Sequence, residues 1–407
     1  MAPKSEASNA PPASGDSPPT NAKKQNLLYN PTFRAIVFQT LAVIGLFFFL
    51  YTIINNALAN LEARGIATGF DFLDQEAGFG IGLTLIEYDE TFSYGRTFVV
   101  GLLNTALVSV LGIIFATIFG FIIGIARLSS NWIVSRLAAV YIETFRNIPL
   151  LLQIFFWYFA VLQVLPSPRQ SLSFGEGIFL NVRGLYLARP VFEQGSIWML
   201  IALTVGVAIS IFYAIFAHRK QRLTGEQSPI LRTTSLLVIG LPLLAYFVTG
   251  MPVSLEYPEL KGFNFRGGIS ILPELAALLL ALSIYTASFI AEIVRSGINA
   301  VSHGQTEAAL ALGLPQGKTL RLVVIPQALR IIIPPLTSQY LNLTKNSSLA
   351  MAIGYPDLVS VFAGTTLNQT GQAIEIIAMT MGVYLTLSLV TSYLMNIYNS
   401  KVALVER

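Results

Sequence analysis

Residues 305–313 read QTEAALALG, a short helix-forming segment inside a chain that is otherwise largely apolar. Glu307 and the alanines after it favour helix, with the carboxylate expected in the first turn. Gly313, with Pro315 behind it, is typical of a helix stop. A hydrophilic loop between two apolar spans has no role toward lipid. We therefore expect a partner in the water to bind it.

The composition indicates a chain that lives in a bilayer. Of its 407 residues, 54% are hydrophobic and only 11% are charged, and the mean hydropathy is +0.65. Ordinary soluble domains carry about 25% charged residues. Since a helix needs about 20 apolar residues to cross the hydrocarbon core, the chain predicts an all-α integral membrane protein.

Eight stretches are long and apolar enough to be such helices. The seventh is interrupted by polar residues 342–348, which predicts a broken or amphipathic helix there. The predicted spans are 35–55, 98–126, 148–165, 197–217, 233–249, 271–294, 334–354 and 372–398.

The distribution of basic residues predicts the orientation. With the amino terminus inside, most of the 25 Lys and Arg residues fall on the cytoplasmic side, as the positive-inside rule requires. An even number of spans then places both termini, and the loop around Glu307, in the cytoplasm. Residues 56–97 become an external loop rich in Asp and Glu.

Several classes of site are excluded or disfavoured. The chain has no cysteine and two histidines, which excludes disulfides and thiol chemistry and disfavours a histidine-rich metal site. Residues 313–319, GLPQGKT, resemble a phosphate-binding loop but are one residue short, and they follow a predicted helix rather than a strand. We therefore expect no bound cofactor, and any nucleotide to be handled by a partner.

Four stretches together resemble one family. Glu307-Ala308-Ala309, Gly313 and Pro326 are similar to the EAA loop of the membrane subunits of ABC importers, with Val323 and Ile325 as conservative departures. Residues 141–151, 285–295 and 345–350 resemble segments of permeases for polar amino acids, the histidine and glutamine type. The extended arrangement most resembles a membrane subunit of the general L-amino acid permease.

The resemblance implies a domain organisation and partners. The second, third, sixth, seventh and eighth spans match a five-helix type-1 permease core at 98–396, with an insert at about 166–268 that carries two extra helices. Residues 1–34 are expected to be a disordered cytoplasmic tail, 35–97 an extra helix with the acidic loop, and 397–407 a cytoplasmic tail. The implied partners are an ABC ATPase dimer, which would bind ATP and Mg, a second homologous permease, and a periplasmic amino-acid-binding protein. The implied location is a bacterial inner membrane.

The resemblance also assigns a coupling segment. A capped helix beginning at Glu307 would sit in a groove of the ATPase and move as a rigid body when the ATPases close. The expected coupling residues are Gln305, Glu307, Ala308, Ala309, Gly313 and Pro326.

Charged residues inside spans are costly and often face a water-filled path or a partner. An amino acid needs an acceptor for its ammonium group and donors for its carboxylate, so we hypothesise that Glu292 and Lys345, with Asn346, line the pathway. Alternatively, Glu292 and Lys345 form a structural pair that locks two helices. Asn104 and Thr105 are further pathway candidates, although hydrogen bonding between helices explains such residues equally well.

Three functions fit the sequence. A membrane subunit of an ATP-driven amino acid importer, which catalyses no covalent reaction, fits best. A secondary, ion-coupled transporter would need inverted repeats and broken helices in both halves. An enzyme acting within the membrane lacks any recognisable catalytic motif.

Overall fold

The structure is a computed structural model that describes residues 31–63, 65 and 68–402. The chain forms two compact units, Met1–Thr68 and Gly69–Arg407. Of the tails expected at 1–34 and 397–407, residues 1–30 and 403–407 lie outside the described residues, whereas residues 31–34 and 397–402 belong to helices.

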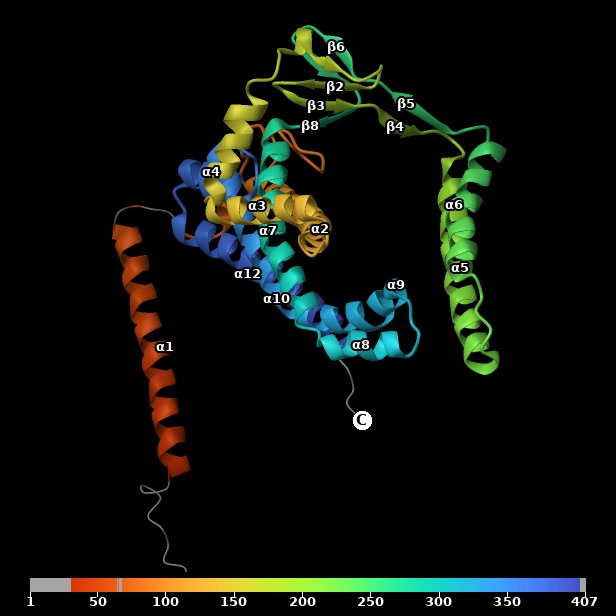
Figure 1. Cartoon of the computed structure of the whole chain (residues 1–407). Coiled ribbons are helices and arrows are strands. Elements are labelled where there is room, and N and C mark those ends of the chain that lie inside the picture. Colours follow the sequence, from red (N-terminus) through yellow and green to blue (C-terminus); the bar gives the residue numbers. More distant parts are fainter. Residues whose placement is uncertain (1–30, 64, 66–67, 403–407) are drawn as a thin grey trace, which may run out of the picture. The chain divides into compact units, whose positions relative to one another are not determined.

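The first unit contains the single long helix α1, Pro31–Ala63 (Figure 1). Its large apolar side chains are exposed, including Phe47 and Phe48. A helix that is apolar on all sides suits lipid rather than water. The helix confirms the first predicted span.

Helices α2 (Tyr94–Arg127) and α7 (Pro273–Asn299) form the centre of the second unit. They approach closely because glycines of α2 face α7. A Cβ atom at Gly120 would lie 2.5 Å from a side-chain carbon of Ile290, and one at Gly124 would lie 2.8 Å from the carbonyl oxygen of Ala291. Small residues at such crossings let the backbones of two membrane helices pack directly.

This contact predicts that Gly120→Leu destabilises the fold. The new side chain would have to displace Ile290 and spread α2 from α7, which we expect to cost about 1 to 3 kcal/mol of the free energy of unfolding. The midpoint of thermal unfolding of the purified chain in detergent measures the change. Gly45→Leu in α1 is the control, since a Cβ there meets nothing within 4 Å. Equal midpoints for the two variants would contradict the packing argument.

Helices α10 (Ile325–Asn346) and α12 (Ala373–Val402) complete this bundle. Gly297 of α7 leaves no room for a Cβ beside Ile332 of α10. After Asn346 the chain tightens into a 3-10 helix, Ser347–Ile353, which ends at Gly354 with a φ of 76°. The break predicted among residues 342–348 is therefore confirmed as a change from α- to 3-10 geometry.

The third predicted span, 148–165, corresponds to the second arm of a bent helix pair rather than to one straight helix. Helix α3 (Trp132–Asn147) is followed by α4 (Leu150–Phe155) and a π-helical turn (η3, Phe156–Leu162), and the two arms meet at 106°. Pro149 causes the break, because a residue before proline is pushed to extended backbone, and Ile148 has φ −94° and ψ 126°. The second arm is too short to cross alone.

Seven of the described helices are long and apolar enough to cross a membrane, and there are eight candidates if the bent pair is counted as one span. The fold is mostly helical, as predicted. Apart from the bent pair, each predicted stretch coincides with a described helix.

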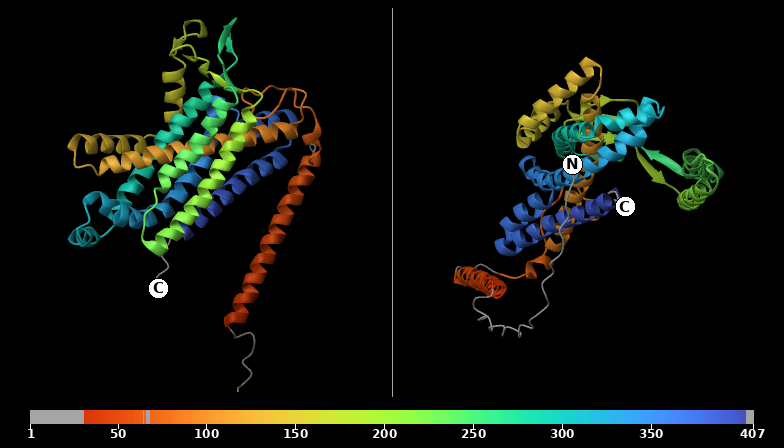
Figure 2. Two further views of the ribbon diagram at one scale, coloured as in Figure 1. Left: turned by 90° about the vertical axis from the view of Figure 1, so that its right-hand side faces the viewer. Right: turned by 60° about the horizontal axis from the view of Figure 1, so that its bottom comes forward.

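The insert at 166–268 holds the two expected helices and also strands that the sequence did not predict. Helices α5 (Ser196–Thr224) and α6 (Ile230–Val248) run side by side (Figure 2). Strand β4 (Arg189–Phe192) leads into this hairpin and pairs with β5 (Val253–Glu256), which leaves it.

The remaining strands are short and lie close to the start of α7. A four-stranded antiparallel sheet has the order β1-β2-β3-β8, and β6 pairs with β7. The bounds are Leu172–Ser173 for β1, Ile178–Asn181 for β2, Gly184–Leu187 for β3, Glu259–Lys261 for β6, Asn264–Arg266 for β7 and Ile269–Ile271 for β8.

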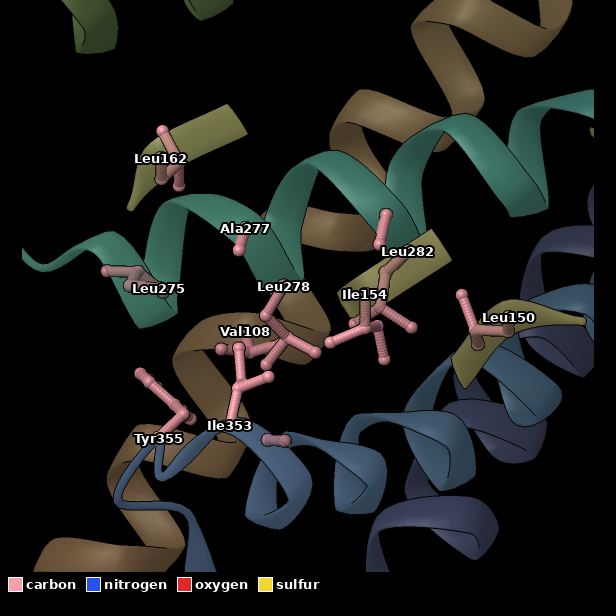
Figure 3. Close-up of a cluster of buried hydrophobic side chains, with 12 residues drawn as sticks. Val108, Leu150, Ile154, Leu162, Leu275, Ala277, Leu278, Leu282, Ile353 and Tyr355 are labelled. Carbon is pink, nitrogen blue, oxygen red and sulfur yellow. The ribbon is translucent and has the colours of Figure 1, made fainter. Parts of the chain in front are cut away.

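The main core lies where α2, α4, α7 and the 3-10 helix meet. Figure 3 shows Ile154 and Leu278 packed against Val108 and Ile353, with Tyr355 at one edge. These side chains are buried, so the short arm α4–η3 is a packed part of the bundle.

Candidate coupling and translocation sites

The segment around Glu307 forms a helical hairpin after α7. Helix α8 (His303–Ala311) leads through a turn to α9 (Gln316–Thr319), a π-helical turn (η5, Leu320–Val324) and then α10. The helix begins four residues earlier than expected, with Ser302 at the N-cap, so the prediction that Glu307 lies in its first turn is wrong. The backbone is already helical at His303, which leaves Glu307 in the second turn.

Gly313 ends α8 as predicted. Its φ is 79°, its N–H donates to the carbonyl of Leu310 at 2.9 Å, and the N–H of Leu314 donates to the carbonyl of Ala309 at 3.1 Å. These two bonds form a Schellman motif, in which the left-handed residue is usually glycine. Pro315 follows at once and prevents the helix from continuing.

One face of α8 packs on the rest of the protein (the seated face), and the opposite face is exposed. Ala309 is only 4% exposed, whereas Leu312 is 83% exposed. Glu307 and Ala308 are also exposed, and Glu307 has no hydrogen bond or ion pair with any described residue. A cavity of about 400 Å³ lies under the seated face, lined by His303, Thr306 and Leu310 of α8 and by residues of α7, α9 and η5.

Two features tie α8 to the spans. The side-chain amide of Gln327 in α10 donates to the side-chain oxygen of Gln305 at 3.2 Å. Pro326 occupies the start of α10, directly after the π-helical turn. The wider turn accommodates a proline that cannot donate a backbone hydrogen bond. The Gln305–Gln327 hydrogen bond thus connects α8 directly to α10.

A second cavity, of about 550 Å³, lies beside Lys345 in the candidate span Gln316–Ile353. The Lys345 side chain is exposed and has no ion pair or hydrogen bond with the described residues. Polar groups line the cavity with it. The lining residues are Lys345, Ser348, Val359, Thr380, Met381, Tyr384, Leu385 and Ser388.

Glu292 is not part of this cavity. It pairs with Arg295 one turn along α7, with Nε to Oε2 at 2.9 Å and Nη2 to Oε1 at 2.5 Å. The alternative of a Glu292–Lys345 pair is therefore wrong, because the nearer cation on the same helix takes the carboxylate. Asn346 is half-buried and does not line the cavity either.

Asn104 and Thr105 are fully buried and hold the loop before η7 (Val359–Thr366). The amide of Asn104 donates to the carbonyls of Leu83 and Pro356, both at 2.8 Å. The hydroxyl of Thr105 accepts from the N–H of Leu358 at 3.0 Å. They lie in the core and not on the wall of the Lys345 cavity, so their geometry supports the hydrogen-bonding explanation.

Asp357 is a buried carboxyl group that the sequence reasoning missed. Its Oδ1 accepts from the N–H of Ser360 at 2.8 Å, and the hydroxyl of Tyr384 donates to its Oδ2 at 3.3 Å. It lies between two spans, and burial raises the pKa of Asp357 to about 7. Since Tyr384 also lines the Lys345 cavity, Asp357 fixes part of that wall. A lone acidic residue in the apolar run 349–363 was the signal that could have found it.

Comparisons with known proteins identify related membrane proteins. Residues 227–404 match the family model described as "Binding-protein-dependent transport system inner membrane component". The chain is 57% identical to the putative amino-acid ABC transporter permease protein YhdX of Escherichia coli, over 93% of this chain and 96% of the relative.

Two further relatives come from other bacteria. The general L-amino acid transport system permease protein AapQ of Rhizobium johnstonii is 52% identical over 94% of this chain and 96% of its own length. The glutamate/glutamine/aspartate/asparagine transport system permease protein BztB of Rhodobacter capsulatus is 43% identical over 96% of this chain and 99% of its own length.

Proposed function

Because the chain belongs to the family of polar amino-acid ABC transporter permeases, we propose that it forms one wall of the translocation pathway at Lys345 and couples to its ATPase through α8. It is the membrane subunit of an amino acid importer, and ATP is hydrolysed by a separate subunit.

The exposed Lys345 side chain is the observation that carries the pathway proposal. A charged side chain at membrane depth is costly unless it faces water or a partner. Lys345 is exposed and has no ion pair or side-chain hydrogen bond among the described residues, and hydroxyl groups of Ser348, Thr380 and Ser388 line the space beside it. A second permease facing this cavity would close it into a polar path, and the ammonium group would attract the carboxylate of a passing amino acid.

The open face of α8 supports the coupling proposal. Exposed apolar side chains on a helix outside the spans are typical of a binding surface. Leu312, the C-cap residue of α8, is exposed, and the unpaired carboxylate of Glu307 is exposed on the helix before it. Since α8 follows α7 directly and is tied to α10, its displacement by an ATPase would move both spans as a rigid body.

The orientation, the partners and the domain limits are proposed from the sequence. We place both termini, α8 and the loop between α5 and α6 on the cytoplasmic side of a bacterial inner membrane, and the strands of the insert outside. We propose an ATPase dimer that holds ATP and Mg, a second homologous permease and a periplasmic binding protein as partners. The domain limits 98–396 for the permease core and 166–268 for the insert are proposed in the same sense.

Replacement of Lys345 tests the pathway. We expect Lys345→Met to raise the KM of ATP-driven uptake about tenfold or more, because a charge-assisted contact with the substrate carboxylate is lost. The assay is uptake of labelled L-glutamine and L-glutamate by membrane vesicles that contain the complete complex, at matched abundance of this chain.

The matched control removes a lysine elsewhere. Lys261→Met breaks the exposed pair with Glu259 in the insert and should leave uptake unchanged. Unchanged KM and substrate range for Lys345→Met would show that Lys345 does not line the pathway.

A further inference from the structure

We propose that a polar cavity between the insert and the start of α7 binds a zwitterionic α-amino acid. The inference rests on the proposed function, since it concerns the same class of substrate. The cavity lies at the N-terminal end of α7, and α8 follows the C-terminal end of the same span. It is therefore on the opposite side of the membrane from the coupling segment, where substrate arrives.

The cavity has the size and lining of a small-molecule site. Its volume is about 730 Å³, within the range of roughly 300 to 1,000 Å³ for ligand pockets. It is lined from three parts of the chain, by Gly82 of the loop before α2, by Gln163 at the end of η3, and by the insert with the start of α7. The polar lining residues are Gln163, Arg183, Tyr186, Asn264, Ser270 and Glu274.

The turn that carries Arg183 is fixed in place. The N–H of Arg183 donates to Oδ1 of Asn181 at 2.8 Å, and the N–H of Val182 donates to the carbonyl of Pro166 at 3.0 Å. Gly184 follows with a φ of 130° and presses against the carbonyl of Ile271, so that no Cβ would fit. The backbone of Arg183 is thus fixed next to the segment that begins α7.

Tyr186 and Phe265 make the inner wall rigid. The buried Tyr186 hydroxyl donates to Oδ1 of Asn264 at 2.8 Å. The ring of Phe265 lies 5.0 Å from that of Tyr186 and stacks on Phe179 at 4.6 Å. A preformed wall reduces the conformational entropy that a ligand would have to remove on binding.

Two opposite charges line this cavity without pairing. Neither Arg183 nor Glu274 forms an ion pair with any residue that the structure describes. Glu274 accepts one hydrogen bond at Oε1, from the Tyr158 hydroxyl at 2.8 Å, and Oε2 has no partner among these residues. An amino acid supplies both missing partners. Its carboxylate suits the planar fork of Arg183, and its ammonium group suits Glu274.

The neutral groups favour a polar side chain on the ligand. Gln163, Asn264 and Ser270 line the same cavity as the two charges, and each can donate and accept hydrogen bonds. A ligand held by Arg183 and Glu274 would bridge the insert to the permease core. The insert would then serve as a receiving site for substrate ahead of the pathway at Lys345.

The absence of native cysteine makes a direct test possible. Ser270 is exposed and lines the cavity, so Ser270→Cys offers one thiol on this chain to a membrane-impermeant methanethiosulfonate reagent. The complete complex in nanodiscs is labelled with and without L-glutamine, and the modification of this subunit is read by its mass. At ten times its Kd, L-glutamine should slow labelling about tenfold by mass action.

Analogues and second substitutions test the chemistry. L-glutamine amide, which lacks the α-carboxylate, and 4-carbamoylbutyrate, which lacks the ammonium group, should protect far less. In the Ser270→Cys background, Arg183→Gln or Glu274→Gln should raise the protecting concentration of L-glutamine about tenfold. Arg169→Gln and Glu176→Gln, on the same insert but outside the cavity lining, are the matched controls and should change nothing.

Each outcome decides between the proposals. If L-glutamine and L-glutamate leave labelling unchanged while the same complex transports them, the site is refuted and the transport function stands. If only the binding protein slows labelling, the cavity is a docking surface for that protein and the site is refuted. If free amino acid protects the thiol but ATP drives no uptake, the site stands and the proposed function fails.

Discussion

Glu307→Lys is expected to abolish ATP-driven uptake while the protein reaches the membrane in normal amount. Glu307 is exposed on α8 and has no partner among the described residues, so its replacement costs the fold little. A reversed charge in a surface that the ATPase must bind costs several kcal/mol when the site is desolvated. We expect the ATPase to co-purify with the native chain from membranes in mild detergent and to be lost from the variant.

Glu226→Lys is the matched control for this experiment. Glu226 is also an exposed carboxylate between two helices, and its pairing with Lys220 is a surface contact of small energy. It should retain both the ATPase and uptake. An active Glu307→Lys complex that keeps its ATPase would refute the coupling proposal. A native chain that transports without any co-purifying ATPase would favour an ion-coupled transporter instead.

The spans could be predicted because the bilayer imposes a simple rule on sequence. An apolar run of sufficient length becomes a helix, since every backbone polar group must be satisfied within it. α1, α5 and α6 follow this rule closely. The bent pair does not, because α3 ends in the largely polar residues 143–147 and the chain turns at Pro149, which leaves an apolar arm of only 13 residues, Leu150–Leu162.

The strands of the insert could not be predicted by such a rule. Its strands are only two to four residues long, too short for an alternating pattern to be recognised. They pair with partners distant in sequence, as when β3 aligns Leu185 with Ile271. Sequence therefore predicted the two helices of the insert and missed its sheets.

Some features of the candidate sites could be predicted from local sequence, and others depend on the fold. Gly313 was predictable because its role depends on local backbone conformation alone. The partner of Glu292 was not, since Arg295 and Lys345 are both cations and only the fold places the first within 2.5 Å. Asp357 was missed because Tyr384, Asn104 and Thr105 reach its loop from helices far away in sequence.

Asp357→Asn is expected to remove most of the pH dependence of stability of this loop. In the folded chain the pKa of Asp357 is raised from 3.8 to about 7, mainly by burial. A carboxyl group whose folded pKa is raised stabilises the fold fully below its unfolded pKa. That stability is lost as the pH rises through the folded pKa, because the charged form must then be buried. The loss spans about pH 4 to 7 and amounts to up to about 4 kcal/mol.

The midpoint of thermal unfolding at pH 5 and pH 8 measures this effect. Asparagine resembles the protonated acid and keeps an oxygen for the N–H of Ser360. The variant should therefore exceed the native chain modestly at pH 5 and by clearly more at pH 8. Asp71→Asn, at an exposed position, should keep the native dependence. If the native chain is equally stable at both values, Asp357 does not titrate in this window. Because Tyr384 joins Asp357 to the Lys345 cavity, a variant that gains stability but loses uptake would show that the carboxylate positions the pathway wall.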